Sequence, residues 1–495
     1  MTRVNSASRT ARRAAGIGLL LALVAAGAPL ASAQDKSMAV SKVERLNRAP
    51  VNKEILRVQL PRPTVVKLPN GLTLVLLEDH KLPTVTFSMR IRPGQLADPG
   101  DLPGLASFTA SMLREGTARR TSTQIASEVD SLGASLSADS DFGVSYTSVE
   151  ASGLTDSAPQ LLDLMSDIVL HPAFPADELT QYKQRATAEL EQNLSSPSFL
   201  AQQQLRRALY GEAPLSIGSP TKESIAKVTA DDLKKFHDAH YRAGNAILGA
   251  AGDFKTADMR ALIEKYFGAW TGAAEAPIPL PKAMATAAKI TLVDRPASVQ
   301  TYILGGNRAV RRTDPDYYAL VVMNQILGGS AQSRLFLDLR EEHGYTYGAY
   351  SGLNAEIYPG EWFAQAPVRT PVTDGSMTQF IYEFKRINSE PVPQSELDDA
   401  HRSLVARFAL SLEQPSVLLQ NWMVTQYYGL PADYWDKYAD HIFAVDAAAV
   451  QATAKKYVDL DHMQWVCVGD RKQIADVLKK YGDVTIVDAE GKAAN

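Results

Sequence analysis

The sequence predicts an α+β fold of two duplicated domains of roughly 200 residues, each an antiparallel sheet backed by helices. Three observations carry this prediction: an internal repeat, a change from strand to helix periodicity, and an Ala- and Pro-rich segment between the copies. In the repeat, residues 177–211 align without a gap with residues 395–429, and every matched pair lies 218 residues apart. Pro197 thus matches Pro415. After a shift of one residue, "ILGAAGDF" matches "QWVCVGDR".

Within the first copy, strand patterns come before helix patterns. Residues 72–78 ("LTLVLLE") and 84–92 ("TVTFSMRIR") alternate or run apolar with β-branched residues, and the Asn-Gly pair in "LPNGL" is a turn signal. Strands followed by helices in one unit are typical of an α+β domain. Helical periodicity follows over four segments, which are residues 104–114, 122–132, 157–170 and 177–193.

The segment 271–288 ("TGAAEAPIPLPKAMATAA") has no amphipathic period and is expected to be an exposed linker. It separates an N-terminal domain over residues 61–270 from a C-terminal domain over residues 289–487. A polar arm over residues 34–60 precedes the first domain, and a short tail over residues 488–495 follows the second.

The first 33 residues are interpreted as a secretory signal peptide. Arginines at positions 3, 9, 12 and 13 precede an apolar run over residues 17–24, and Ala31-Ser32-Ala33 forms a small-x-small cleavage pattern. We therefore expect the mature chain to begin at Gln34 and to reside in the periplasm.

Composition excludes several classes of partner. The net charge of the whole chain is −4, and an acidic chain lacks the basic surface that nucleic acid or an anionic membrane would require. No stretch after the first 33 residues approaches the roughly 20 apolar residues of a membrane span. The one cysteine, Cys467, lies in the apolar "QWVCVGD", so we expect a buried strand thiol and no internal disulfide.

The segment 104–117 ("GLASFTASMLREGT") has the rhythm of a short amphipathic helix whose polar face carries only hydroxyl groups. Ser107 and Ser111 are four residues apart, so they lie on one helical face, with Ala110 between them. This face has no side chain that could act as a strong base or bind a metal tightly.

Several motifs together resemble the pitrilysin/insulinase family of zinc peptidases, particularly its mitochondrial processing peptidase branch. They are "LPNGLTLVLLEDHKLPTVTFSMRIRPGQLADPGDLPGLASFTASMLREGT", "LHPAFPADEL", "GDF" and "LGGSAQSRLFLDLREEHGYTYGAYS", and they occur in the family's order over about residues 60 to 485. The resemblance implies that the two domains form a half-shell. It also implies that a helix matching 104–114 carries His-x-x-Glu-His in active members, with two zinc ligands and a general base.

At those three positions this chain has Ser107, Ala110 and Ser111. The resemblance therefore implies a degenerate motif with no catalytic residue, no metal ligand and no cofactor in this chain. The family's remaining ligand, a glutamate on a later helix, corresponds to Glu189 in "AELEQNLSSP". A lone carboxylate cannot hold a catalytic zinc ion, so we interpret Glu189 as a salt-bridged or solvated helix residue.

In the second copy, Arg340 and Tyr347 of "LREEHGYTYGAYS" match a pair that in active family members holds the substrate backbone. A guanidinium group and a phenolic hydroxyl can both donate hydrogen bonds to peptide carbonyls. The alternative is that Arg340 is a solvated helix-end charge and that Tyr347 is a core aromatic residue.

Other site types receive little support. His237 and His240 are spaced three apart but lie in an ordinary amphipathic pattern, and the remaining six histidines, His343 included, are scattered singly. No Gly-x-Ser-x-Gly elbow or phosphate-binding loop is present, and "SPTK" (219–222) is better explained as a helix start.

The sequence therefore predicts a non-catalytic subunit of a periplasmic heterodimeric zinc metallopeptidase. Its expected partner is a homologous subunit that bears the zinc ion, and the expected substrates are unfolded or short peptides. We expect this chain to be inactive alone. The alternative is a stand-alone periplasmic peptide-binding or scaffolding protein with no link to proteolysis.

Overall fold

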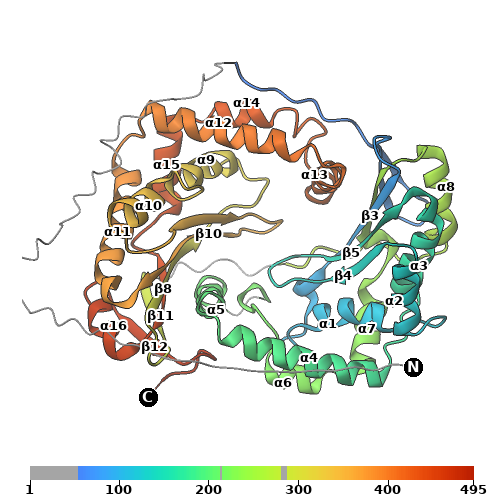
Figure 1. Cartoon of the computed structure of the whole chain (residues 1–495), viewed down its shortest axis with the longest axis horizontal. Helices are drawn as coiled ribbons and strands as arrows, with labels where there is room; N and C mark the ends of the chain where they lie inside the picture. The colour runs from blue at the N-terminus through green and yellow to red at the C-terminus, as the bar shows by residue number, and fades with distance from the viewer. Residues whose placement is uncertain (1–53, 212–213, 280–286, 495) are drawn as a thin grey trace, which may run out of the picture. The chain divides into compact units, whose positions relative to one another are not determined.

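The computed structural model describes residues 54–211, 214–279 and 287–494 (Figure 1). The predicted signal peptide over residues 1–33 and most of the arm over residues 34–60 lie outside the described residues. Within the described part, every helix is too short or too polar to cross a bilayer. Below, residues 54–279 are called the N-terminal half and residues 287–494 the C-terminal half.

The N-terminal half contains a six-stranded sheet in the order β1-β2-β6-β3-β5-β4. Its strands are β1 (Thr64–Lys67), β2 (Thr73–Glu78), β3 (Thr84–Ile91), β4 (Ser135–Asp139), β5 (Thr147–Leu154) and β6 (Ala246–Gly252). Its helices are α1 (Leu105–Met112), α2 (Ser122–Ser131), α3 (Ala158–Leu170), α4 (Ala176–Leu194), α5 (Pro197–Tyr210), α6 (Lys222–Lys227), α7 (Ala230–His240) and α8 (Thr256–Phe267).

The C-terminal half contains a second six-stranded sheet in the order β12-β7-β11-β8-β10-β9. Its strands are β7 (Lys289–Asp294), β8 (Gln300–Arg308), β9 (Tyr350–Asn354), β10 (Glu361–Arg369), β11 (Gln464–Gly469) and β12 (Val484–Val487). Its helices are α9 (Tyr317–Leu327), α10 (Arg334–Phe336), the π-helix Leu337–Glu342, α11 (Thr373–Ser389), α12 (Gln394–Ser411), α13 (Pro415–Tyr428), α14 (Tyr438–Phe443), α15 (Ala447–Tyr457) and α16 (Arg471–Leu478).

The predicted α+β duplication is confirmed. Helices α5 and α13 begin at the matched prolines of the repeat, and the order β2-β6-β3-β5-β4 in one sheet corresponds to β7-β11-β8-β10-β9 in the other. The sheets are mixed rather than purely antiparallel, because β6 pairs with β2 in parallel and β11 pairs with β7 in parallel. Three other strands of the sheet and several helices lie between the two strands of each pair in the chain, and a connection of this length permits parallel pairing.

Each sheet turns one face toward helices of its own half. In β2, Leu74 and Leu76 belong to the core that the N-terminal sheet shares with helices α1, α3, α7 and α8. In β11, Trp465 and Cys467 belong to the corresponding C-terminal core. The buried strand position of Cys467 is the one that its apolar surroundings predict.

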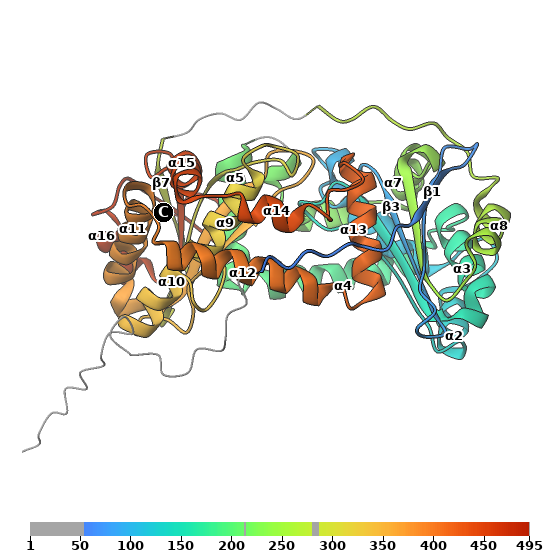
Figure 2. The same cartoon turned by 90° about the horizontal axis from the view of Figure 1, so that it is seen from above.

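The opposite face of each sheet is covered by a helix from the other half. Val75 and Leu77 of β2 pack with Leu419 and Met423 of α13, because side chains alternate between the two faces of a strand. In the same way, α5 packs on β8 and β11 of the C-terminal sheet. Figure 1 shows α5 beside β8 and β11, and Figures 1 and 2 show α13 beside the N-terminal sheet. The two halves thus exchange helices α5 and α13.

Candidate functional site

Helix α1 carries the three positions of the degenerate motif, and its start is fixed by Asp98 and Gly104. The Asp98 carboxylate accepts hydrogen bonds from the backbone N–H groups of Gly104 (2.7 Å) and Ala106 (2.8 Å). Gly104 has φ = 93°, a left-handed conformation that favours glycine. Burial raises the pKa of Asp98 to about 7, although the two N–H donors oppose this.

The polar face of α1 is turned toward helix α4. Ala110 is fully buried, whereas Ser107 and Ser111 are half-buried. The hydroxyl group of Tyr182, on α4, donates a hydrogen bond of 3.0 Å to Ser111 Oγ. The Tyr182 ring packs edge-on against Phe108 of α1, with ring centroids 5.0 Å apart. Burial raises the pKa of Tyr182, although hydrogen bonds with Ser111 and Ser107 oppose this shift. The tyrosine therefore stays a neutral donor on this face.

These residues do not fit a catalytic zinc ion. Zinc takes thiolate, imidazole and carboxylate ligands, whereas this face offers two serine hydroxyls and a methyl group. One of these hydroxyls, that of Ser111, already accepts a hydrogen bond from Tyr182. Glu189 lies two turns beyond Tyr182 on α4, is exposed, and its negative charge adds to the rise in the Tyr182 pKa. This face of α1 thus offers neither the two imidazoles nor the carboxylate of a His-x-x-Glu-His motif.

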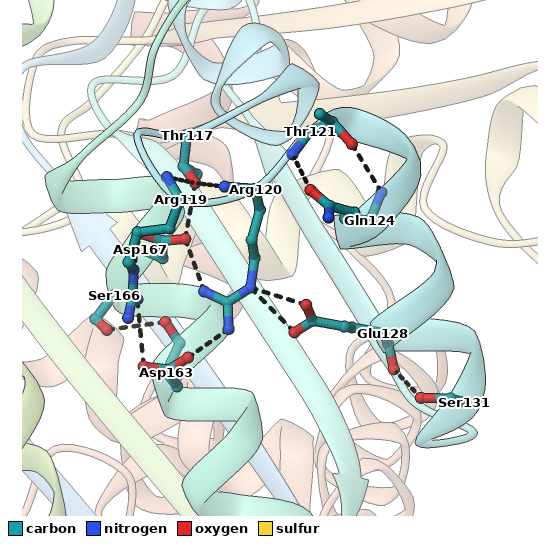
Figure 3. A network of polar contacts seen from close by, with 10 residues as sticks. All are labelled: Thr117, Arg119, Arg120, Thr121, Gln124, Glu128, Ser131, Asp163, Ser166 and Asp167. Atoms are coloured by element: carbon teal, nitrogen blue, oxygen red, sulfur yellow. Dashed lines mark hydrogen bonds and ion pairs between the residues drawn. The ribbon is translucent and has the colours of Figure 1, made fainter.

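A polar network fixes the segment between α1 and α2 onto α3 (Figure 3). The Arg120 guanidinium group pairs with Asp167 (2.7 Å), Asp163 (2.5 Å) and Glu128 (3.0 Å). Asp167 is fully buried and also accepts a hydrogen bond from Thr117 Oγ1 (2.8 Å). Burial alone would raise the pKa of Asp167, but these hydrogen bonds hold it below its ordinary value. The network is structural, and it joins the segment after α1 to helices α2 and α3.

An open hollow beside Ser111 extends to the edge of the N-terminal sheet. Its lining includes Arg114 and Glu115 at the end of α1, Ser122 at the start of α2, and Asp139 of strand β4. Since β4 is an edge strand, one side of its backbone is free of ladder pairing. The motif face of α1 and an unpaired strand edge thus border the same hollow.

Arg340 and Tyr347 lie in and just after the π-helix Leu337–Glu342. The Arg340 guanidinium lies 4.8 Å from the Phe336 ring centre and 3.4 Å from the carboxylate of its neighbour Glu341. Tyr347 is 89% exposed, and its hydroxyl forms no hydrogen bond with the described residues. The alternative interpretation of Tyr347 as a core aromatic residue is therefore wrong.

The chain on either side of Tyr347 is held in place. Thr346 Oγ1 donates a hydrogen bond of 2.6 Å to the Pro367 carbonyl of β10, and the Gly348 N–H donates to Thr346 Oγ1 (3.1 Å). Gly328 ends α9 and accepts a hydrogen bond from the Ser351 N–H (2.9 Å). A Cβ atom at Gly328 would lie 2.4 Å from that nitrogen, so the close approach requires glycine. Tyr347 is thus an exposed side chain on an anchored segment.

The histidines differ in role. His237 is buried, its Nε2 lies 2.8 Å from the Val169 carbonyl oxygen, and burial lowers its pKa. His240 pairs with Glu275 (3.0 Å). Both are structural, as their helical pattern indicates. His343 departs from expectation, because it lies in a cluster with Asp338 and Glu342 rather than alone. The spacing in "DLREEH" hides this cluster, since in a regular α-helix residues five apart point in different directions.

Comparison with known families agrees with this geometry. A family model described as Insulinase (Peptidase family M16) matches residues 73–220, and one described as Peptidase M16 inactive domain matches residues 227–404. A protein of Bacillus subtilis named an uncharacterized zinc protease is 27% identical over 285 residues, which cover 57% of this chain and 68% of that protein. A similarly named protein of Mycobacterium leprae is 27% identical over 363 residues, 72% of this chain and 79% of that protein.

Solved structures share the fold. A structure described as a peptidase M16 inactive domain from Pseudomonas fluorescens has a TM-score of 0.77 and 28% identity, covering 83% of this chain and 98% of that one. A protease from Helicobacter pylori has a TM-score of 0.77 and 18% identity, covering 83% of this chain and 100% of that one, a likeness of fold alone. From the two adjoining family matches and the shared duplicated fold, we conclude that this chain belongs to the insulinase-type M16 peptidase family.

Proposed function

We propose that this chain is the non-catalytic subunit of a periplasmic heterodimeric zinc metallopeptidase, and that it closes the substrate chamber of a homologous zinc-bearing partner. The polar face of α1 carries this proposal. At the motif positions, Ser107, Ala110 and Ser111 supply neither zinc ligands nor a general base. The Tyr182 hydroxyl donates a hydrogen bond to Ser111 on the same face. A family member of this kind contributes to proteolysis through a partner that keeps its own motif.

The C-terminal half supports a role in substrate binding. The Tyr347 hydroxyl is free and exposed, and Arg340 is half-exposed with only its sequence neighbour as an ion-pair partner. A neutral donor and a guanidinium group suit peptide carbonyl oxygens or a developing oxyanion. Tyr347 precedes β9, an edge strand of its sheet, and an unpaired edge can bind an extended peptide as an added strand. Unfolded or short peptides are the substrates that such an edge accommodates.

The first test compares the chain alone with the chain in its native complex. We expect the purified chain to leave a mixture of unstructured peptides intact in zinc-containing buffer, and to copurify from the periplasm with a homologue that has an intact His-x-x-Glu-His motif. Peptide hydrolysis by the lone chain that a chelator abolishes would contradict the proposal. Peptide binding by the lone chain with no homologous partner recovered would instead favour the scaffolding alternative.

The second test addresses the substrate pair in the assembled complex. We expect Arg340→Ala and Tyr347→Phe each to lower kcat/KM by about 10- to 100-fold, because each removes a directed donor. Arg260→Ala and Tyr382→Phe are matched controls, since both side chains are surface groups on other helices. If kcat/KM were the same in all four variants, the proposed role of Arg340 and Tyr347 in substrate binding would be contradicted.

The third test asks whether only the motif was lost. Replacing Ser107, Ala110 and Ser111 by His, Glu and His restores the motif, but the Tyr182 side chain still lies against position 111. We expect chelator-sensitive peptidase activity in the lone chain only when Tyr182→Ala is added, with Glu189 retained as the remaining carboxylate. Full activity of the triple variant with Tyr182 present would show that this tyrosine does not block the site.

A further inference from the structure

The π-helix Leu337–Glu342 brings together residues that a regular helix would separate. The His343 N–H donates to the Asp338 carbonyl oxygen at 3.1 Å, a hydrogen bond between residues five apart. In an α-helix, side chains five apart diverge by about 140°, but the wider π-turn brings them to one side. As a result, His343 Nδ1 lies 2.7 Å from Asp338 Oδ1.

Glu342 completes a group of three potential metal ligands. One ligand atom from each of Asp338, Glu342 and His343 lies within 4.8 Å of the other two, and no other such group occurs among the described residues. The donors of a divalent ion with bonds of about 2.1 Å are about 3–3.5 Å apart. To hold one ion, the exposed Glu342 side chain would rotate inward, and Asp338 Oδ1 and His343 Nδ1 would move apart from their present 2.7 Å.

The surroundings of the Asp338 carboxylate are the second observation in favour of a cation. The residue is only 7% exposed, yet its Oδ1 accepts no hydrogen bond from the described residues. The nearby ring nitrogen lacks hydrogen-bond geometry toward this oxygen and instead lies 3.1 Å from the Asp338 backbone carbonyl oxygen. A buried carboxylate oxygen without a donor is costly. The His343 imidazole, 2.7 Å away, is the group that favours the Asp338 carboxylate, whereas the carboxylates of Glu383 and Glu342 disfavour it.

The surroundings of His343 suit a metal-bound imidazole. Its Nε2 lies 3.3 Å from the side-chain amide nitrogen of Gln379 on α11. A 180° rotation of that amide places its carbonyl oxygen there instead, as an acceptor for the Nε2–H group. A ligating histidine commonly donates its second ring N–H in this way. His343 Nδ1 would then exchange its contact with the Asp338 carbonyl oxygen for the metal.

We propose that Asp338, Glu342 and His343 form a binding site for a divalent transition-metal ion of the zinc type, with water completing the coordination. The site is separate from the degenerate face of α1. His343 lies four residues before Tyr347, so a bound ion stiffens the segment that carries this exposed tyrosine. Two carboxylates with one imidazole favour Zn²⁺ over Mg²⁺, which prefers oxygen ligands alone.

The test uses the purified full chain without an affinity tag, stripped of metal with a chelator and titrated calorimetrically with Zn²⁺. We expect one saturable site, absent with Mg²⁺ as the probe. His343→Gln and Asp338→Asn should each weaken Zn²⁺ binding at least tenfold, whereas the Ser107→Ala/Ser111→Ala variant should bind as the unchanged chain does. His462→Gln is the matched control, because His462 also pairs with an aspartate, Asp459, at 2.6 Å but has no third ligand.

Two further measurements keep the outcome decisive. If Asp338→Asn fails to fold, the His343→Gln variant tests the site alone. The His343 ring is partly exposed, so we expect this variant to fold. Co²⁺ added in place of Zn²⁺ should give visible absorption that His343→Gln removes. No saturable Zn²⁺ binding, or binding unaffected by both substitutions, would overturn the proposal. Peptidase activity is not the readout, so this result stands apart from the proposed subunit role.

Discussion

The exchanged helix α13 allows a quantitative prediction at its contact with strand β6. A Cβ atom at Gly249 would lie 2.8 Å from Leu419 Cδ1 and 2.8 Å from Met423 Sδ. Gly249→Ala therefore overpacks the contact, and we expect it to lower the free energy of unfolding by about 1–3 kcal/mol. Leu419 is fully buried. Leu419→Ala should therefore lower the free energy of unfolding by about 3–4 kcal/mol, because buried apolar contacts are lost and a cavity remains.

Combined, the two substitutions should compensate each other. Leu419→Ala removes two of the three atoms that the new methyl group meets and leaves only Met423 Sδ, at the end of a flexible side chain. The double variant should therefore be about 1–2 kcal/mol more stable than the sum of the single effects implies. Urea unfolding followed by tryptophan fluorescence and far-ultraviolet circular dichroism measures all four free energies. Gly306→Ala is the matched control, because Gly306 faces Leu205 of α5 instead, and its effect should add to that of Leu419→Ala. Additive effects of Gly249→Ala and Leu419→Ala, within about 0.5 kcal/mol, would refute the packing of α13 on β6.

Three other predictions follow from buried groups. Burial raises the pKa of Asp98 from its usual value to about 7. The contribution of Asp98 to the free energy of unfolding is therefore complete below pH 4, and it falls by up to about 4 kcal/mol as the pH rises through 7. Unfolding of wild type and Asp98→Asn measured from pH 4 to 8 shows this difference, and a wild type that gains relative stability with pH would contradict it. Arg120→Met should lower the free energy of unfolding in urea at neutral pH by about 3 kcal/mol, since the buried Asp167 then keeps only Arg119 as its cationic partner. A decrease under about 0.5 kcal/mol would argue against the network. The Cys467 thiol is fully buried, and burial raises its pKa to about 12, so an aromatic disulfide reagent should label it only after unfolding; rapid labelling of the native chain would contradict its place in β11.

Periodicity and repeat together predicted much of the fold. The segments 104–114, 122–132, 157–170 and 177–193 correspond to α1 to α4, with ends that agree within a few residues. The exchange of α5 and α13 could not be predicted, because an apolar helix stripe does not identify the sheet that it covers. One signal was present: "LTLVLLE" runs apolar over five of its seven positions, which indicates a strand buried on both faces.

The candidate site was predicted in part. The positions of the degenerate motif follow from the resemblance, but the Tyr182 hydroxyl beside Ser111 depends on how α4 packs against α1. The cluster of Asp338, Glu342 and His343 was missed, because a helical pattern of 3.6 residues per turn places Asp338 and His343 apart. Only the π-turn brings them together, and such turns have no dependable sequence signature.

The exchange of α5 and α13 also sets the order in which the chain can finish folding. The second face of the N-terminal sheet, with Val75, Leu77 and Ile247, has its cover only once residues 415–428 have been made. Until α13 docks, an apolar sheet face stays open to water and to other chains. The first half therefore cannot complete its folding as an independent domain.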